Sequence, residues 1–170
     1  NLTSIEIPSS VISIGDYAFS GCANLKKVII RKGAQITSNN IFGYGFINTK
    51  KIFVEANKDE VNWDTEYPDW NDGNKVYYGG EWIEVEYYKH NGEYITNDCF
   101  LLNDTITIPN IHHYKIGEKY YCITGWDIDG DGVADTIPTS SSTNITAKAI
   151  VEETNITHHE RVEASAEAEG

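Results

Sequence analysis

The first third of the chain repeats its apolar positions at a fixed interval. The segment "NLTSIEIPSSVISIGDYAFSGCA" (1–23) aligns with "NLKKVIIRKGAQITSNNIFGYGF" (24–46), and a slipped third copy begins at "NTKKIFVEAN" (48–57). Alternating apolar residues in each copy predict a short strand whose apolar side chains point into a core. A period of this length is typical of a solenoid, in which each repeat buries its apolar face against the next. The apolar residues of these copies that are predicted to lie in the interior are Ile5, Ile7, Val11, Ile14, Phe19, Leu25, Val28, Ile30, Phe42, Ile52 and Val54.

The second half of the chain has a different pattern, in which apolar and polar residues alternate one by one. "EWIEVEYYKHNGEYITNDCFLLNDTITIPNI" alternates around turn signals at Asn91-Gly92 and Asn103-Asp104, and "KYYCITGWDI" and "TNITAKAIVEE" supply further strands. A short helical turn is expected near 109–118. This half is predicted to be a small, mainly antiparallel β domain. The boundaries are placed at 1–80 for the repeats and their cap, 81–153 for the β domain, and 154–170 for a flexible tail or linker.

The motif of the first repeat resembles a known family. In "LTSIEIPSSVISIGDYAFSGCANL" the matching positions are Leu2, Ile5, Ile7, Pro8, Val11, Ile14, Gly15, Ala18, Phe19, Gly21 and Cys22. This pattern is similar to the BspA-like leucine-rich repeat of bacterial and some protozoan surface proteins. The second copy departs from it, with Arg31 in place of the proline. The resemblance covers residues 1–80 and implies a short leucine-rich-repeat solenoid.

An aromatic cluster follows the third copy, where the repeat pattern decays. It consists of Trp63, Tyr67, Trp70, Tyr77, Tyr78 and Trp82. We expect these residues to cap the solenoid, because the last repeat must cover its own open end. The alternative is a platform that stacks on sugar rings, since flat apolar faces complement the C–H faces of hexoses. Its ligand-facing candidates are Trp63, Tyr67, Trp70 and Trp82.

The second half also resembles a family. "IGEKYYCITGWDIDGDGVADTIPTSSSTNITAKAI" looks like the C-terminal half of the Listeria–Bacteroides repeat, also called the internalin B-repeat type. Gly125, Trp126 and the strand "NITAKAI" carry the similarity. The resemblance covers residues 85–151 and implies a β-grasp-like fold, in which Trp126 belongs to the core.

A loop in this half has the spacing of a calcium site. If Asp127 of "DIDGDGVADT" is position 1, then Asp129 is at 3, Asp131 at 5, Gly132 at 6, Val133 at 7 and Asp135 at 9. These positions match the EF-hand calcium loop, in which position 7 contributes a backbone carbonyl. Position 12 is Pro138, so the bidentate Glu is absent and the affinity should be weak. We expect a structural Ca²⁺ here; the alternative is a solvated Asp/Gly turn between two strands.

Net charge and missing motifs narrow the class of function. The formal net charge of −13 disfavours binding to nucleic acid and to anionic membranes, and no apolar run has the length of a membrane span. Without a methionine or a signal-peptide pattern, we expect the sequence to be a fragment of a longer protein. Cys22, Cys99 and Cys122 have no metal-binding spacing; buried free thiols are favoured over a Cys99–Cys122 bridge.

Common catalytic motifs are absent from the sequence, including G-x-S-x-G, H-E-x-x-H and the phosphate-binding glycine loops. We therefore predict a non-catalytic module of a secreted or wall-attached bacterial protein, which binds host or neighbouring surface proteins. The alternative is a carbohydrate-binding accessory region of a larger secreted enzyme, with glycans as its partners.

Overall fold

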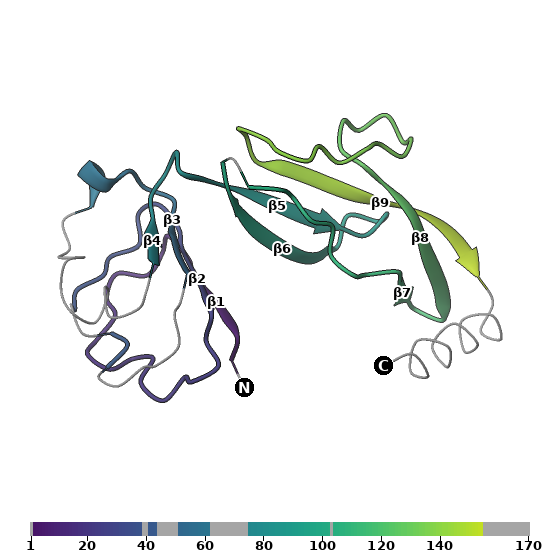
Figure 1. Cartoon of the computed structure of the whole chain (residues 1–170). Helices are drawn as coiled ribbons and strands as arrows, with labels where there is room; N and C mark the ends of the chain where they lie inside the picture. The colour runs from purple at the N-terminus through teal and green to yellow at the C-terminus, as the bar shows by residue number, and fades with distance from the viewer. Residues whose placement is uncertain (1, 39–40, 44–50, 62–74, 103, 155–170) are drawn as a thin grey trace. The chain divides into compact units, whose positions relative to one another are not determined.

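The chain forms two compact units, Asn1–Trp82 and Ile83–Gly170, and each unit has its own β-sheet (Figure 1). The computed structural model describes residues 2–38, 41–43, 51–61, 75–102 and 104–154. Among these residues, strands are far more abundant than helix, of which there is one short 3-10 turn, η1 (Lys58–Glu60). The prediction of a mainly β protein is confirmed.

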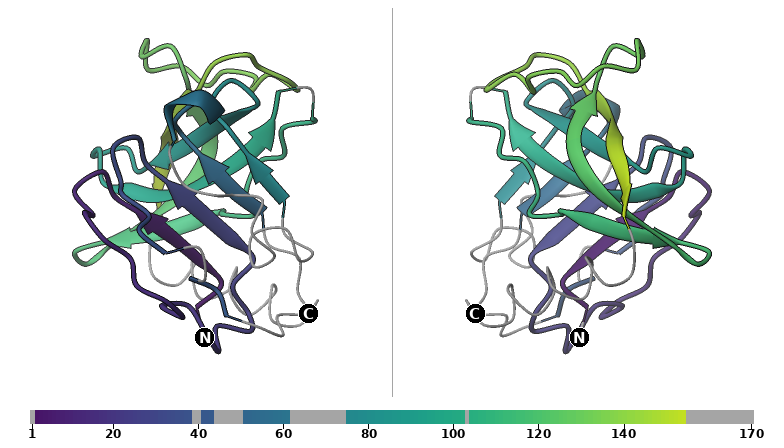
Figure 2. Two further views of the ribbon diagram at one scale, coloured as in Figure 1. Left: turned by 90° about the vertical axis from the view of Figure 1, so that its left-hand side faces the viewer. Right: turned by 90° about the vertical axis from the view of Figure 1, so that its right-hand side faces the viewer.

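The first unit contains a parallel sheet with one strand from each repeat. The strands are β1 (Ser4–Ile7), β2 (Lys27–Ile30), β3 (Lys51–Val54) and β4 (Lys75–Tyr77), and they lie side by side in this order (Figure 2). Ile5 pairs with Val28, Val28 with Ile52, and Ile52 with Val76. The predicted repeat offset is therefore the register of the sheet, and β4 adds a fourth strand that the decaying pattern did not predict.

The predicted interior of the first unit is confirmed. Eight of the eleven predicted residues are buried in one cluster: Ile7, Ile14, Leu25, Val28, Ile30, Phe42, Ile52 and Val54. The other three, Ile5, Val11 and Phe19, are partly buried and pack against the same cluster. Phe19 and Phe42 have ring centroids 5.9 Å apart, so the matching aromatic positions of the first two copies meet inside the unit.

Two aromatic residues after the last repeat strand are buried: Tyr78, which belongs to the repeat core, and Trp82. The indole N–H of Trp82 donates a hydrogen bond to the carbonyl oxygen of Val54 at 3.0 Å. The Trp82 ring also lies 5.2 Å from that of Phe53. Between the two aromatics, a Cβ on Gly79 would lie 2.5 Å from the carbonyl oxygen of Glu55, so only glycine fits there.

The second unit has a five-stranded mixed sheet with the order β6-β5-β9-β8-β7. The bounds of its strands are β5 (Trp82–Tyr88), β6 (Tyr94–Leu101), β7 (His113–Ile116), β8 (Lys119–Asp127) and β9 (Ile145–Thr154). β5 and β9 pair in parallel, whereas β8 is antiparallel to both β7 and β9.

Two local predictions for the second unit can be checked against these strands. The turn at Asn91-Gly92 joins β5 to β6, and Gly92 has the positive φ of 89° that such a turn requires. The helical turn expected near 109–118 is wrong, because β7 lies there and pairs with β8. The sheet is also not wholly antiparallel, since β5 and β9 run in the same direction.

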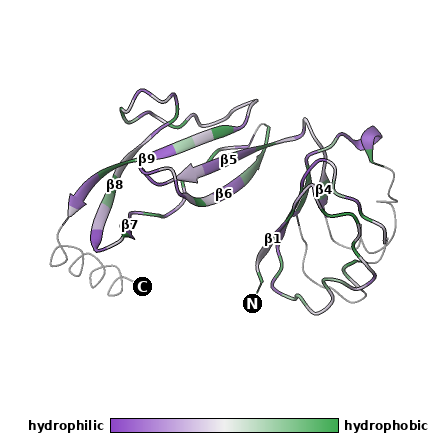
Figure 3. Ribbon diagram, turned by 180° about the vertical axis from the view of Figure 1, so that it is seen from behind, coloured by the Kyte–Doolittle hydropathy of each residue, from purple (hydrophilic) through white to green (hydrophobic). Residues whose placement is uncertain are grey.

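One face of this sheet carries the core of the second unit. Bands of hydrophobic and hydrophilic residues follow each other along β8 and β9 (Figure 3), as expected for a sheet with one covered face. Trp126 is only 5% exposed and packs edge-to-face on Tyr87, with ring centroids 4.9 Å apart. The predicted core position of Trp126 is confirmed.

None of the three cysteines forms a disulfide, and each is half-buried. The favoured prediction of unbridged thiols therefore agrees with the structure, although Cys22, Cys99 and Cys122 are less deeply buried than expected. Cys122 lies on β8 opposite His113 and Glu152.

The pH dependence of the free energy of unfolding tests the burial of Tyr87 in the core of the second unit. Its hydroxyl is buried without a hydrogen-bond partner among the described residues, and burial, aided by Asp98, raises its pKa to about 12. In the unfolded chain Tyr87 ionises near the usual pKa of about 10. The unfolded state therefore loses this proton first, and the free energy of unfolding should fall as the pH rises from 10 to 12.

The variant Tyr87→Phe should remove this part of the alkaline destabilisation, because phenylalanine has no proton to lose. At neutral pH it should be as stable as the parent, or more stable by about 1 kcal/mol, since no buried hydroxyl is left unpaired. Urea denaturation of both proteins at neutral pH and above pH 10 checks this. A variant that is strongly destabilised at neutral pH would contradict the unpaired hydroxyl.

Candidate functional site

The acidic loop at the end of β8 is closed by short hydrogen bonds to its own backbone. The Asp127 carboxylate accepts from the N–H groups of Gly130 and Gly132 at 2.7 and 3.0 Å. The Asp135 carboxylate accepts from the N–H of Ile128 at 2.8 Å. The N–H of Asp135 donates to the carbonyl oxygen of Trp126 at 2.7 Å. The loop therefore starts directly after the buried residue Trp126 and returns to it through the hydrogen bond from Asp135.

Three of the four predicted aspartate ligands converge in this loop. Carboxylate oxygens of Asp127, Asp129 and Asp135 lie within 4.8 Å of one another. Asp127 is only 6% exposed, whereas Asp129 is at the surface. Gly130 and Gly132 have φ values of 86° and 84°, which allow the chain to fold the three carboxylates inward. A hard cation with oxygen ligands, such as Ca²⁺, is the ion that this group could hold.

The other two predicted ligands are placed differently. Asp131 is outside the group of three, and its carboxylate accepts from the N–H of Val133 at 2.8 Å. The Val133 side chain is exposed; its predicted contribution was the backbone carbonyl. The same backbone hydrogen bonds would serve a self-contained acidic turn, so the calcium site stays a prediction.

The predicted aromatic platform is not assembled by the described residues. Trp63, Tyr67 and Trp70 lie outside them. Trp82 is 9% exposed and packs on Phe53 with its N–H bound to Val54. Trp82 is therefore largely buried against Phe53, and the aromatic platform stays a prediction.

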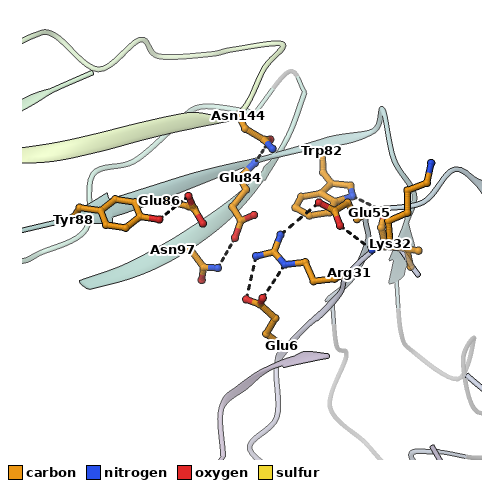
Figure 4. Close-up of polar contacts among 11 residues, drawn as sticks. Glu6, Arg31, Lys32, Glu55, Trp82, Glu84, Glu86, Tyr88, Asn97 and Asn144 are labelled. Carbon is orange, nitrogen blue, oxygen red and sulfur yellow. Dashed lines mark hydrogen bonds and ion pairs between the residues drawn. The ribbon is translucent and has the colours of Figure 1, made fainter. Parts of the chain in front are cut away.

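An ion-pair cluster that the sequence did not predict joins the first three repeats. Arg31 donates to both carboxylate oxygens of Glu6, at 2.8 and 3.1 Å, and lies 3.9 Å from Glu55 (Figure 4). Arg31 occupies the position where the first repeat has Pro8. The sequence signal for this cluster was the departure of the second copy from the repeat motif. Arg31 replaces the proline there, and the glutamates Glu6 and Glu55 lie on the two neighbouring repeats.

Lys32 extends this cluster toward η1. Its backbone N–H donates to Glu55 at 2.8 Å, and its ammonium donates to Glu60 at 2.6 Å. The hydrogen bond from Lys32 is the main cause that lowers the pKa of Glu60. A pocket of about 320 Å³ lies beside these residues, with Ile36, Val54 and Val61 among its apolar lining.

A buried carboxylate also lies in the second unit. Glu84 on β5 is nearly inaccessible; its carboxylate accepts from the amide of Asn97 at 2.5 Å (Figure 4). The backbone N–H of Glu84 donates to Asn144 at 2.9 Å. Glu84 therefore connects β5 to β6 and to the segment before β9. Such buried polar groups remain stable only when they are hydrogen-bonded.

Comparison with known proteins identifies the repeat region. Residues 1–64 match the family model of the BspA type leucine rich repeat region (6 copies). The resemblance seen in the first repeat is confirmed for this part of the chain. No curated protein and no solved structure matches the sequence. The resemblance of residues 85–151 to the Listeria–Bacteroides repeat stays a prediction.

The matched family indicates where proteins with such repeats are found and what the repeats do. BspA-type leucine-rich repeats are typical of bacterial cell-surface proteins, where they serve protein interaction, and they are generally non-catalytic. In the described part of the chain, no helix has the length and apolar character of a membrane span.

Proposed function

We propose that this chain is a non-catalytic module of a secreted or cell-surface bacterial protein, and that it mediates protein–protein interaction or adhesion. The observation that carries the proposal is the match of residues 1–64 to the BspA type leucine rich repeat region. The parallel sheet of the first unit supports it, because consecutive strands in constant register present a regular outer surface. Host or neighbouring surface proteins are the proposed partners.

The proposed organisation assigns a different role to each part of the chain. Residues 1–80 are the capped end of a leucine-rich-repeat solenoid, which supplies the binding surface. Residues 81–153 are a β-grasp-like domain, which acts as a spacer; the central parallel pair of β5 and β9 supports this assignment. The predicted tail or linker, 154–170, lies outside the described residues beyond the end of β9.

Within the spacer domain, we further propose that the acidic loop holds a structural Ca²⁺. Asp127, Asp129 and Asp135 would supply carboxylate oxygens, and their convergence within 4.8 Å supports this. Asp131, which lies outside this group, and the Val133 carbonyl complete the proposed set of ligands.

The interaction function is tested by comparing two ligand arrays with the purified chain. We expect saturable binding to one or more extracellular proteins and no binding on a glycan array. The control is the isolated second unit, expressed as residues 81–153 and confirmed to be folded, which should not bind the same proteins. Binding to glycans alone would favour the alternative, a carbohydrate-binding accessory region, and would refute a protein-interaction module.

A further inference from the structure

The pocket of about 320 Å³ in the first unit lies between the second and third repeats, just after their strands. The buried part of its lining is apolar, since Ile30, Val54 and Ala56 are at most 7% exposed. Next to them lie partly buried apolar side chains that pack against the repeat core: Ala34, Ile36 and Val61. Ligand pockets of proteins measure about 300–1,000 Å³, so this pocket has room for one small apolar group.

The course of the third repeat after its strand explains the pocket. Between the first two repeats, the N–H of Gln35 donates to the carbonyl oxygen of Val11 at 2.9 Å. The register of β2 and β3 places the equivalent of Gln35 within η1 (Lys58–Glu60). In the described part of the chain, no backbone hydrogen bond joins 31–36 to 56–61. Side chains therefore connect these two segments, and space remains between them.

The charged side chains of the pocket are already paired within the unit. The ammonium of Lys32 donates to Glu60 at 2.6 Å. Arg31 lies 2.8 Å from Glu6 and 3.9 Å from Glu55. A ligand that binds through a charged head alone would have to break one of these pairs. An apolar group can enter beside them and gain from contact with the apolar lining.

The surroundings of the pocket nevertheless favour a positive charge close to this apolar group. Lys32 balances Glu60, whereas Arg31 stands against two carboxylates and is more buried than they are. The Arg31 side chain is 18% exposed, and those of Glu6 and Glu55 are 45% and 44% exposed. The whole chain also has a net charge of −13. Because complementary charges steer association, a basic residue in the partner should favour binding at this place.

We propose that this pocket binds an aromatic side chain of a partner protein, and that a lysine or arginine adjoins the aromatic residue in the partner. This proposal rests on the proposed interaction function and adds the place of contact and the chemistry of the partner. Aromatic side chains bury a large apolar area, and those that fill a pocket at the centre of an interface often contribute most of the binding energy. The basic neighbour would lie close to the exposed carboxylates of Glu55 and Glu60.

The first test titrates the full chain with three synthetic hexapeptides. The first peptide contains a tryptophan followed by a lysine among neutral residues, the second has alanine for the tryptophan, and the third has glutamate for the lysine. We expect the second to bind at least about tenfold more weakly than the first, because the anchor is lost. The third should also bind more weakly, by a difference that shrinks as salt is raised. Methyl NMR should show shifts at Ile36, Val54 and Val61 with the first peptide.

A substitution that fills the pocket tests the site itself. Ala34→Leu adds bulk to the lining and should weaken binding of the first peptide by about tenfold or more, since the anchor is then excluded. The control Ala18→Leu makes the same change at an exposed alanine of the first unit and should bind like the parent. Thermal melting checks that both variants are folded. If Ala34→Leu is not, the methyl shifts of the parent chain still decide where the peptide binds.

The variant Glu60→Gln tests the basic neighbour. Its side-chain oxygen can still accept the hydrogen bond that Glu60 receives from the N–H of Asn57 at 2.9 Å, so η1 is preserved while the charge is lost. This variant should discriminate less between the lysine and the glutamate peptides. The control Glu118→Gln changes the net charge equally at an exposed position of the second unit and should keep the full preference.

Four outcomes would overturn the inference: equal binding of the first two peptides, methyl shifts confined to residues outside the pocket, equal loss of binding in both leucine variants, and self-association of the chain that Ala34→Leu abolishes. The last would assign the pocket to a second copy. Partners on the protein array that bind Ala34→Leu as well as the parent would leave the interaction function intact and remove only the aromatic anchor. An array without any protein partner would remove the function itself.

Discussion

Replacing Trp126 by alanine should lower the free energy of unfolding of the second unit by about 3–5 kcal/mol, the range for truncation of a buried large aromatic residue. Trp126 is 5% exposed and packs edge-to-face on Tyr87. Its backbone pairs with Ala149 on β9 and, across the loop, with Asp135. Domains of this size are marginally stable, so we expect the second unit of the variant to be largely unfolded at 37 °C.

Chemical denaturation monitored by circular dichroism measures this effect, and two controls define it. Ile108→Ala removes an apolar side chain of the same unit that is 54% exposed and should cost within about 0.5 kcal/mol. Trp126→Phe retains an aromatic ring and should be intermediate. If Trp126→Ala unfolds with the same midpoint as the parent, Trp126 is not part of the core of this unit.

The fold of the repeat unit could be predicted well because the apolar positions that match between repeats are also the positions that pair in the sheet. A residue that keeps the offset from Ile5 to Val28 to Ile52 stacks directly on its equivalents in the parallel sheet. The fourth strand was missed because the segment after Val54 is rich in Asn, Asp and Gly. Its signal was nevertheless present, since Lys75-Val76-Tyr77 repeats the residue types of Lys51-Ile52-Phe53.

The topology of the second unit could not be predicted in the same way. Alternation along a strand identifies the buried face, but it does not identify the neighbouring strand. The parallel pairing of Val85 with Ile145 joins residues that lie far apart in the sequence, and no turn signal connects them. By contrast, the turn at Asn91-Gly92 was predicted because positive φ at glycine is a local property.

The candidate sites show the same division between local and distant information. The acidic loop was predicted from spacing, and Asp127, Asp129 and Asp135 do converge, since the glycines between them act locally. The burial of Trp82 depends on contacts with Phe53 and Val54, nearly thirty residues away, so a sequence pattern alone left both the cap and the platform open. The ion pairs of Arg31 with Glu6 and Glu55 were missed because they become visible only once the register is known.

Calcium should stabilise the second unit if the acidic loop binds it. Only the folded loop presents Asp127, Asp129 and Asp135 together, so the ion binds the folded state and not the unfolded chain. At a free concentration of about 100 times the dissociation constant, the free energy of unfolding should rise by roughly 2.7 kcal/mol. Magnesium should have a much smaller effect, because it requires a tighter octahedral geometry and releases its water reluctantly. Thermal melting of chelator-treated protein with millimolar calcium or magnesium measures both effects.

Asp129→Asn is the most informative variant for this site. Its side-chain oxygen can still accept the hydrogen bond that Asp129 receives from the N–H of Asp131 at 3.1 Å, so the turn is preserved while one charged ligand is lost. The control Asp104→Asn removes an exposed charge elsewhere in the same unit and should keep the full calcium response. Without the ion, neighbouring carboxylates repel each other by about 1 kcal/mol per pair even in water, so Asp129→Asn should be at least as stable as the parent in chelator. A calorimetric titration without heat, together with equal melting temperatures with and without calcium, would leave the loop as an acidic turn held by its own backbone.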